Sequence, residues 1–97
     1  MKLYVLIRND LSKSQKTVQG IHAVAQILLS KKDVSWNNGH VICLRVTDEL
    51  ELKTYISKAK ELKLDCDFFR EPDIGNEITA VAILSSSGEI FKDLVLL

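Results

Sequence analysis

Hydrophobic residues occur along the chain both in continuous runs and at helical spacing, and their succession predicts the element order β-α-β-α-β-β. The run Lys2–Arg8 (KLYVLIR) is nearly all apolar and rich in β-forming residues, which suits a central strand buried on both faces. Further strands are predicted at His40–Val46, Asp65–Arg70 and Thr79–Leu84. The last segment, Glu89–Leu97, fits either a short helix or an edge strand.

The first predicted helix follows the turn residues Asn9 and Asp10. It begins near Ser12 or Ser14, since either hydroxyl can cap its amino end, and it ends near Ser30. Four apolar residues recur at helical spacing along it and predict the face that is buried against the sheet. They are Val18, Ile21, Ala25 and Leu28.

The second predicted helix begins after Thr47 or Asp48, and Glu51 is spaced for a capping box with Asp48. Its buried face is predicted from apolar residues at helical spacing. They are Leu52, Tyr55, Ile56, Ala59 and Leu62. Polar loops are predicted on either side of the middle strands, at Lys31–Gly39 and at Glu71–Ile78, the second of which contains the only proline.

The length and the order of elements predict the fold class. A chain of 97 residues can bury one core, so a single domain is expected. Two consecutive strand-helix units favour crossover connections and at least partly parallel pairing. A loop of about eight residues joins the strands Asp65–Arg70 and Thr79–Leu84, which allows these two to pair as a hairpin or in a mixed arrangement. The expected fold class is therefore α/β.

Composition excludes several classes of protein. Hydrophobic residues make up 46% of the chain and charged residues 27%, which are ordinary values for a globular domain. No apolar run is long enough to span a membrane. The amino terminus lacks the apolar core and the small-residue cleavage site of a signal peptide, so we expect a cytoplasmic protein.

The formal net charge is zero, which argues weakly against a nucleic-acid-binding protein, but the charges are unevenly distributed. Residues 1–63 hold 11 Lys and Arg against 6 Asp and Glu, a balance of +5. Residues 64–97 hold 2 against 7, a balance of −5. The amino-terminal part could therefore present a basic face to a polyanion, or its lysines could simply be solvated on helix surfaces.

The cysteines and histidines do not form a metal-binding pattern. Cys43 and Cys66 lie in apolar stretches far apart, and His22 and His40 have no metal-like spacing to them. We expect two buried structural thiols, no zinc site and no cofactor. A glycine-rich phosphate loop, a nucleophile elbow and a Cys/His dyad are also absent from the sequence, so a covalent mechanism has no support in it.

A polar stripe on the first predicted helix is a candidate for chemistry. Gln15, Gln19, His22 and Gln26 fall within roughly 60° of one another around a helix. The stripe follows the carboxyl end of a strand, where ligands gather in open α/β sheets. It could bind a ligand, with His22 as a general base, or be a semi-exposed polar helix edge. His40 opens a strand, and a structural role is expected for it.

A second polar segment, Arg70–Asp73 (REPD), follows the third predicted strand. It gathers a guanidinium and the carboxylates of Glu71 and Asp73, and Pro72 limits its flexibility. Carboxylates at a strand end could orient a water molecule or an imidazole, or they could merely cap the turn.

Taken together, these segments resemble the type 2 peptidyl-tRNA hydrolase family over nearly the whole chain. The resemblance rests on RNDL (Arg8–Leu11) after the first strand, on the set Gln19, His22 and Ala23 on a helix, and on Trp36–Gly39 before the second strand. It continues through the acidic turn REPD, the strand TAVAIL and the terminal FKDLVLL. The order and spacing of these motifs are more specific than any one of them.

The resemblance implies a fold and an activity. The fold is a four-stranded mixed β-sheet flanked by helices, as one domain over residues 1–97. The activity is hydrolysis, without a metal, of the ester between a peptide and the 3′ ribose of tRNA by an activated water. Basic residues would hold the phosphates of the tRNA partner. A homodimer is compatible with this activity.

The site residues that the resemblance implies fall into two groups. The expected catalytic residues are His22, Glu71, Asp73 and Thr79. The expected substrate-binding residues are Arg8, Lys13, Lys16 and Gln19.

One position departs from the family pattern. Four residues before Gln19, where the family usually has a functional lysine, this chain has Gln15. Either Lys13 or Lys16 substitutes for that lysine, or the chain is a tRNA- or RNA-binding module without catalysis. A third hypothesis, a small oligomeric interaction protein, rests on the zero net charge and the apolar tail Leu94–Leu97.

Overall fold

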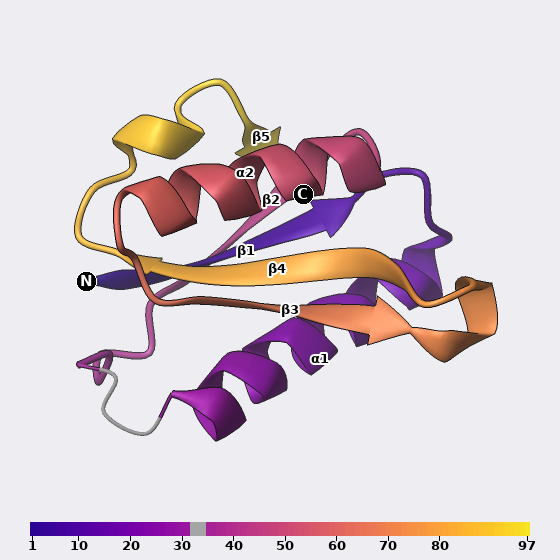
Figure 1. Cartoon of the computed structure of the whole chain (residues 1–97), viewed down its shortest axis with the longest axis horizontal. Helices are drawn as coiled ribbons and strands as arrows, with labels where there is room; N and C mark the ends of the chain where they lie inside the picture. Colours follow the sequence, from indigo (N-terminus) through magenta and orange to yellow (C-terminus); the bar gives the residue numbers. More distant parts are fainter. Residues whose placement is uncertain (32–34) are drawn as a thin grey trace.

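The computed structural model describes residues 1–31 and 35–97 as a mixed β-sheet with one helix on each face (Figure 1). The strands are β1 (Lys2–Arg8), β2 (Val41–Val46), β3 (Cys66–Glu71), β4 (Glu77–Ser85) and β5 (Val95–Leu96). The helices are α1 (Lys13–Ser30) and α2 (Glu49–Glu61), with short 3-10 turns η1 (Pro72–Ile74) and η2 (Glu89–Phe91). The predicted α/β class and element order are confirmed.

The sheet has five strands in the order β3-β4-β1-β2-β5, one more than the four expected. β1 and β2 are parallel, and the three other pairs are antiparallel. The extra strand is β5, whose Val95 and Leu96 pair with Arg45 and Leu44. Two residues are too few to show a strand periodicity, so the segment Glu89–Leu97 could not be resolved into η2 followed by β5 from sequence.

This topology gathers the polar ends of several elements at one edge of the sheet. β1, β2 and β3 all end there and β4 begins there, because β3 and β1 are both antiparallel to β4. Each helix follows a strand that ends at this edge, so α1 and α2 also begin there. The amino ends of two helices and the carboxyl ends of three strands therefore surround the same space.

α2 packs as its pattern predicts. Asp48 caps it through a hydrogen bond from the Glu51 amide to Asp48 Oδ1 (3.0 Å), and Glu51 Oε1 accepts from the Thr47 amide (2.7 Å). The buried residues Leu52, Tyr55, Ile56 and Ala59 share a core with Tyr4, Leu6, Val81 and Phe91. Leu62 was wrongly predicted to be buried; it is 55% exposed because α2 ends at Glu61.

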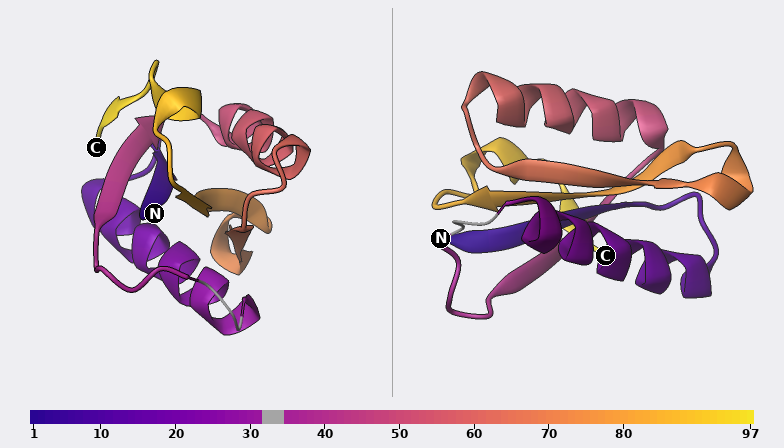
Figure 2. Two further views of the ribbon diagram at one scale, coloured as in Figure 1. Left: turned by 90° about the vertical axis from the view of Figure 1, so that its left-hand side faces the viewer. Right: turned by 60° about the horizontal axis from the view of Figure 1, so that its bottom comes forward.

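α1 begins after Ser12, as predicted, but its predicted buried face is wrong. Val18, Ile21 and Leu28 are 47%, 64% and 44% exposed, and Ala25 is exposed as well. The residues that face the sheet are Gln19, Gly20, Ala23 and Ile27. At about 100° per residue, the centre of this face lies roughly 165° from the centre of the predicted one. Figure 2 shows α1 against the face of the sheet opposite to α2.

Small residues explain this rotation of α1. A Cβ atom on Gly20 would lie 2.8 Å from Ile7 Cδ1, so the helix backbone sits directly on β1. Ala23 and Ile27 pack with Ala80 and Ala82 of β4. The close approach that these small side chains permit leaves no room for a row of Val, Ile and Leu between helix and sheet.

Cys43 and Cys66 are free and half-buried, and burial raises the pKa of both thiols, that of Cys66 to about 11.

Of the predicted loop Lys31–Gly39, residues 32–34 lie outside the described residues. Gly39 ends this loop with a φ of 71°, a conformation that favours glycine.

The orientation of α1 predicts opposite effects for two neighbouring residues. Ile27→Ala removes a fully buried side chain and should lower the free energy of unfolding by about 2–5 kcal/mol. Leu28→Ala removes an exposed one and should change it by about 0.5 kcal/mol or less. Urea unfolding at low protein concentration measures both. A larger loss at Leu28 than at Ile27 would show that α1 faces the other way.

Candidate active site

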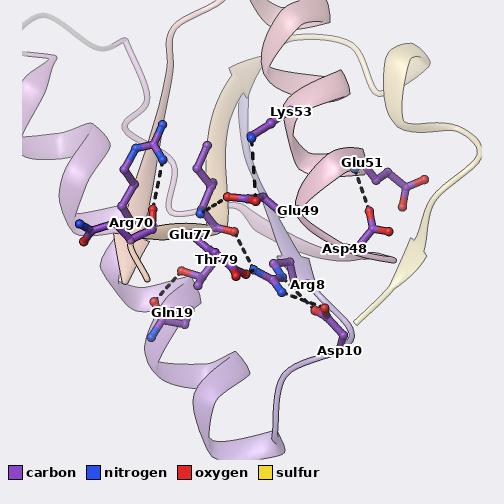
Figure 3. A network of polar contacts seen from close by, with 12 residues as sticks. Arg8, Asp10, Gln19, Asp48, Glu49, Glu51, Lys53, Arg70, Glu77 and Thr79 are labelled. Carbon is purple, nitrogen blue, oxygen red and sulfur yellow. Dashed lines mark hydrogen bonds and ion pairs between the residues drawn. The ribbon is translucent and has the colours of Figure 1, made fainter. Parts of the chain in front are cut away.

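A buried arginine connects the strands at the polar edge of the sheet. Arg8, the last residue of β1, is 8% exposed. Its Nε and Nη2 donate to the two carboxylate oxygens of Asp10 (2.9 and 2.8 Å), and its Nη1 donates to Glu77 Oε1 (2.7 Å) and to the Ile78 carbonyl (3.2 Å). Figure 3 shows Arg8 between these partners. The predicted substrate-binding residue Arg8 thus links β1 to the start of β4.

The Arg8 network also sets the charge at this edge. The hydrogen bonds from Arg8 hold the pKa of Asp10 below its ordinary value, because the ionised carboxylate accepts them. The same bonds, that with Asp10 foremost, raise the pKa of Arg8 against the opposing effect of burial. The single guanidinium of Arg8 is thus paired with two carboxylates, those of Asp10 and Glu77.

β4 contains a bulge at the residue that the family resemblance singles out. Phe69 pairs with Ala80, but the next residue, Arg70, pairs with Ile78, so Thr79 is an extra residue in β4. As a result Thr79 and Ala80 both face α1, although neighbours in a regular strand face opposite ways. The bulge therefore aims the Thr79 hydroxyl at α1.

The Thr79 hydroxyl meets the polar stripe of α1 in the core. Thr79 Oγ1 donates to Gln19 Oε1 at 2.6 Å, and these residues are 0% and 1% exposed (Figure 3). Gln19 Nε2 donates in turn to Gln15 Oε1 at 3.1 Å, and Gln15 is exposed. The result is a hydrogen-bonded chain from the buried threonine to the surface of α1.

His22 lies beside this chain. Its ring stacks on Phe69 of β3, with centroids 4.2 Å apart and planes at 11°. The Phe69 carbonyl lies 3.4 Å from Thr79 Oγ1, so β3 connects the imidazole to the Gln19–Thr79 pair. His22 is half-buried. Three of the predicted site residues, Gln19, His22 and Thr79, are therefore brought together.

The two predicted acidic residues lie at the margin of this cluster. Glu71 ends β3, is half-buried and pairs in the sheet with Glu77, whereas Asp73 is exposed in η1. Within residues 1–31 and 35–97, neither carboxylate is hydrogen-bonded to His22, Gln19 or Thr79. Glu71 lies in β3 two residues after Phe69, whereas Asp73 lies beyond the end of the strand, in η1.

The two predicted lysines occupy the first turn of α1. Lys13 is exposed, and Lys16 is half-buried with its Nζ donating to Asn9 Oδ1 at 2.8 Å. Around the helix axis Lys16 lies about 100° from Gln15. Lys16 thus points toward the loop after β1, and Gln15 occupies the flank that carries His22.

Three residues of this region escaped the sequence analysis. Phe69 supports His22, Glu77 pairs with Arg8, and Glu49 Oε2 accepts from the Ile78 amide at 2.7 Å. Phe69 and Glu77 belong to elements distant from α1 and β1 in sequence, so spacing carries no signal for them. Glu49 could have been found from the sequence, because it lies in the first turn of α2 and that turn begins at the edge where the strands end.

A polar hollow of about 370 Å³ opens at the same edge on the side of α2 and β5. Asp10, Arg45, Thr47, Glu51 and Asp93 are among the residues that line it.

A family model described as peptidyl-tRNA hydrolase PTH2 matches residues 1–95. The chain belongs to this family. The match covers every strand and helix described above except the last residue of β5, Leu96.

Comparison with solved structures supports the fold of this family member. A protein of unknown function, Atu0240, from Agrobacterium tumefaciens strain C58 superposes with a TM-score of 0.73 and 15% identity. The match covers 99% of this chain and 96% of the other. At this identity the likeness concerns the fold alone. A comparison with curated proteins finds no match.

Neither α1 nor α2 is both long and apolar enough to cross a membrane. Within residues 1–31 and 35–97, no three His, Cys, Asp or Glu side chains gather as metal ligands would.

The buried Thr79 hydroxyl should be needed for stability. Thr79→Val keeps the shape of the side chain but leaves Gln19 Oε1 without its donor in the core, which should cost about 1–3 kcal/mol of unfolding free energy. Thr54→Val, at an exposed position on α2, is the matched control and should cost about 0.5 kcal/mol or less. Equal losses in chemical unfolding would contradict the role of the Gln19–Thr79 bond.

The Arg8–Asp10 pair should make stability depend on acid pH. Because the pKa of Asp10 is lowered in the folded protein, its contribution is complete above the ordinary value of 3.8 and is lost as the pH falls below it. Asp10→Asn should therefore flatten the loss of stability between about pH 5 and pH 3. Asp93→Asn, at an exposed position, should leave that slope unchanged. Thermal unfolding across this pH range tests the difference.

Proposed function

We propose that this chain hydrolyses the ester that joins a peptide to the 3′ ribose of tRNA. The observation that carries the proposal is the cluster of Gln19, His22 and Thr79 at the polar edge of the sheet, in a chain of the peptidyl-tRNA hydrolase PTH2 family. The family supports the class of substrate. The cluster supports a water-activating site, because it holds an imidazole beside an ordered polar chain.

In the proposed mechanism His22 acts as the general base. A water oxygen attacks the ester carbonyl carbon while His22 accepts the proton of that water, and the C–O bond to the ribose then breaks. The released 3′ oxygen takes the proton back from His22. Stacking on Phe69 holds the imidazole in place, and Glu71, two residues after Phe69 in β3, is the first acidic candidate to orient the water or the ring. Asp73, in the adjoining turn, is the other.

Gln19 and Thr79 have a positioning role in this proposal. Both side chains are buried and hydrogen-bonded to one another, so neither is free to contact a polynucleotide without breaking that bond. They set the height and rotation of α1 against the sheet, which determines where His22 and Gln15 lie. The exposed Gln15 amide, polarised by Gln19, is the group we assign to the carbonyl oxygen of the ester.

Basic side chains around the same edge would bind the tRNA phosphates. Lys13 and Lys16 lie in the first turn of α1, and Arg45 is exposed at the end of β2. Arg8 is different, since its guanidinium already binds two carboxylates and a carbonyl. We therefore assign Lys13 and Lys16 to phosphate contacts and Arg8 to holding the edge of the sheet in shape.

A second candidate function is tRNA binding without hydrolysis. The observation that favours it is Gln15, which brings a neutral amide to the position where the family usually has a lysine. In the structure neither Lys13 nor Lys16 lies on the flank of α1 that carries Gln15 and His22. A site without a cation there would stabilise charge on the carbonyl oxygen less well.

Peptide release from an N-acetyl-aminoacyl-tRNA by the purified protein tests the hydrolase proposal. His22→Phe keeps an aromatic ring against Phe69 but removes the base, and it should lower the rate by about 100-fold. Gln15→Lys should raise it. His40→Ala changes an exposed histidine away from this cluster and should have no effect. His22→Phe prepared in parallel also controls for a contaminating hydrolase.

Binding measurements separate the two candidates. Salt-sensitive tRNA binding without release, in wild type and in Gln15→Lys alike, would favour the binding module and reject the hydrolase. In either case Lys13→Ala and Lys16→Ala should each reduce the slope of log affinity against log salt by about 0.7–0.9. Absence of both binding and release would reject both candidates.

A further inference from the structure

Side chains from two other elements bind the main-chain N–H and C=O of Ile78 in β4. The pairing of β1 with β4 stops before Ile78, at Ile7 and Ala80, and Ile78 is only 2% exposed. Its main-chain groups therefore need partners within the protein. The N–H donates to Glu49 Oε2 at 2.7 Å, and the C=O accepts from Arg8 Nη1 at 3.2 Å. The start of α2 and the end of β1 thus hold the same residue of β4.

Ile78 borders the bulge that aims Thr79 at α1. Ile78 and Val81 both lie in the core under α2, although they are three residues apart, and Ala80 lies in the core under α1. Without the extra residue the strand would alternate regularly, and Thr79 would face α2. A bulge interrupts the ladder, so bonds from outside the ladder are needed to hold it in one place. The bonds from Glu49 and Arg8 to Ile78 are of this kind.

The carboxylate of Glu49 is itself held in place. Glu49 is the first residue of α2, where the helix dipole favours a negative charge, and its side chain is 26% exposed. Its Oε1 lies 3.8 Å from the ammonium of Lys53, one turn further along α2, while Oε2 accepts from Ile78. Both oxygens therefore have partners within the protein, and the carboxylate acts on β4.

The bulge connects Glu49 to the candidate active site. Thr79 follows Ile78 in the chain and donates to Gln19 of α1, and Figure 3 shows Glu49 and Arg8 on one side of Thr79 and Gln19 on the other. A shift of Ile78 would move Thr79 and loosen the bond that orients α1. Since α1 carries His22, a side chain of α2 influences a group on the opposite face of the sheet.

We propose that Glu49 is a positioning residue for the hydrolysis, a role that rests on the proposed function. Together with Arg8 it fixes the two main-chain groups of Ile78, which keeps Thr79 directed at Gln19 and thereby His22 at its place on α1. Glu49 does not contact the substrate in this role. Its loss should therefore reduce turnover and leave tRNA binding by the first turn of α1 unchanged.

Steady-state kinetics on N-acetyl-aminoacyl-tRNA test this role. Glu49→Ala should lower kcat by up to about 100-fold, the effect of displacing a reacting group by about 1 Å, with KM nearly unchanged. Glu49→Gln keeps an acceptor oxygen for the Ile78 N–H and should stay within about threefold of wild type. Glu49→Asp keeps the charge but is one methylene shorter, so it should also lower kcat, and it replaces Glu49→Ala should that variant not fold.

Asp48→Ala is the matched control. It removes the neighbouring carboxylate and the bond that the Glu51 amide donates to it (3.0 Å), which weakens the same end of α2 but leaves the Ile78 bonds in place. Its kcat should equal that of wild type. An equal loss of kcat in Asp48→Ala and Glu49→Ala, or an effect on KM alone, would overturn the role of Glu49.

NMR spectroscopy follows the bulge independently of turnover. In Glu49→Ala the amide of Ile78 should exchange with solvent faster, and the side-chain amide signal of Gln19, identified by its loss in Gln19→Glu, should shift. Both should remain as in wild type in Asp48→Ala. An unshifted Gln19 signal in Glu49→Ala would overturn the proposed connection. Absence of release by the wild type would reject the hydrolase and this role together, whereas equal release by wild type and Glu49→Ala would reject this role alone.

Discussion

The side-chain amide of Gln19 lies between α1 and the sheet, where it is almost completely removed from water and must be hydrogen-bonded. The Thr79 hydroxyl supplies that bond only because the bulge in β4 turns it toward α1. Together with the close contact between Gly20 and Ile7, the bond leaves α1 one orientation. In this orientation of α1, every buried side-chain nitrogen and oxygen of the described residues has a hydrogen-bond partner.

This orientation determines what the polar edge of the sheet can do. With Gln19 facing inward, His22 lies on the flank of α1 against Phe69, and Gln15 is the surface end of the hydrogen-bonded chain. Arg8 independently joins the ends of β1 and β4 through Asp10 and Glu77. Membership of the peptidyl-tRNA hydrolase PTH2 family and this arrangement support the same class of reaction. In the mechanism we propose, the neutral Gln15 amide is the group assigned to the carbonyl oxygen of the ester.

The same orientation has a cost on the other side of the helix. Since the small residues of α1 face the sheet, its Val, Ile and Leu side chains face solvent next to the open part of the sheet at β2. The inner side of α1 is therefore closely packed, and its outer side is apolar.

The sequence by itself determined the element order, the α/β class and the family, and it limited each helix cap to two candidates, because runs, caps and motif spacing are local properties. It also predicted Gln19, His22 and Thr79 as site residues, and the structure brings these three together. The rotation of α1 about its axis could not be predicted from the sequence. Hydrophobicity favours burial of Val18, Ile21 and Leu28, and it does not reveal that Gly20 lies directly against Ile7. The bulge at Thr79, the stacking of Phe69 on His22 and the pairing of Glu77 with Arg8 join residues distant along the chain. Only the tertiary structure decided these, because each depends on how strands and helices pack.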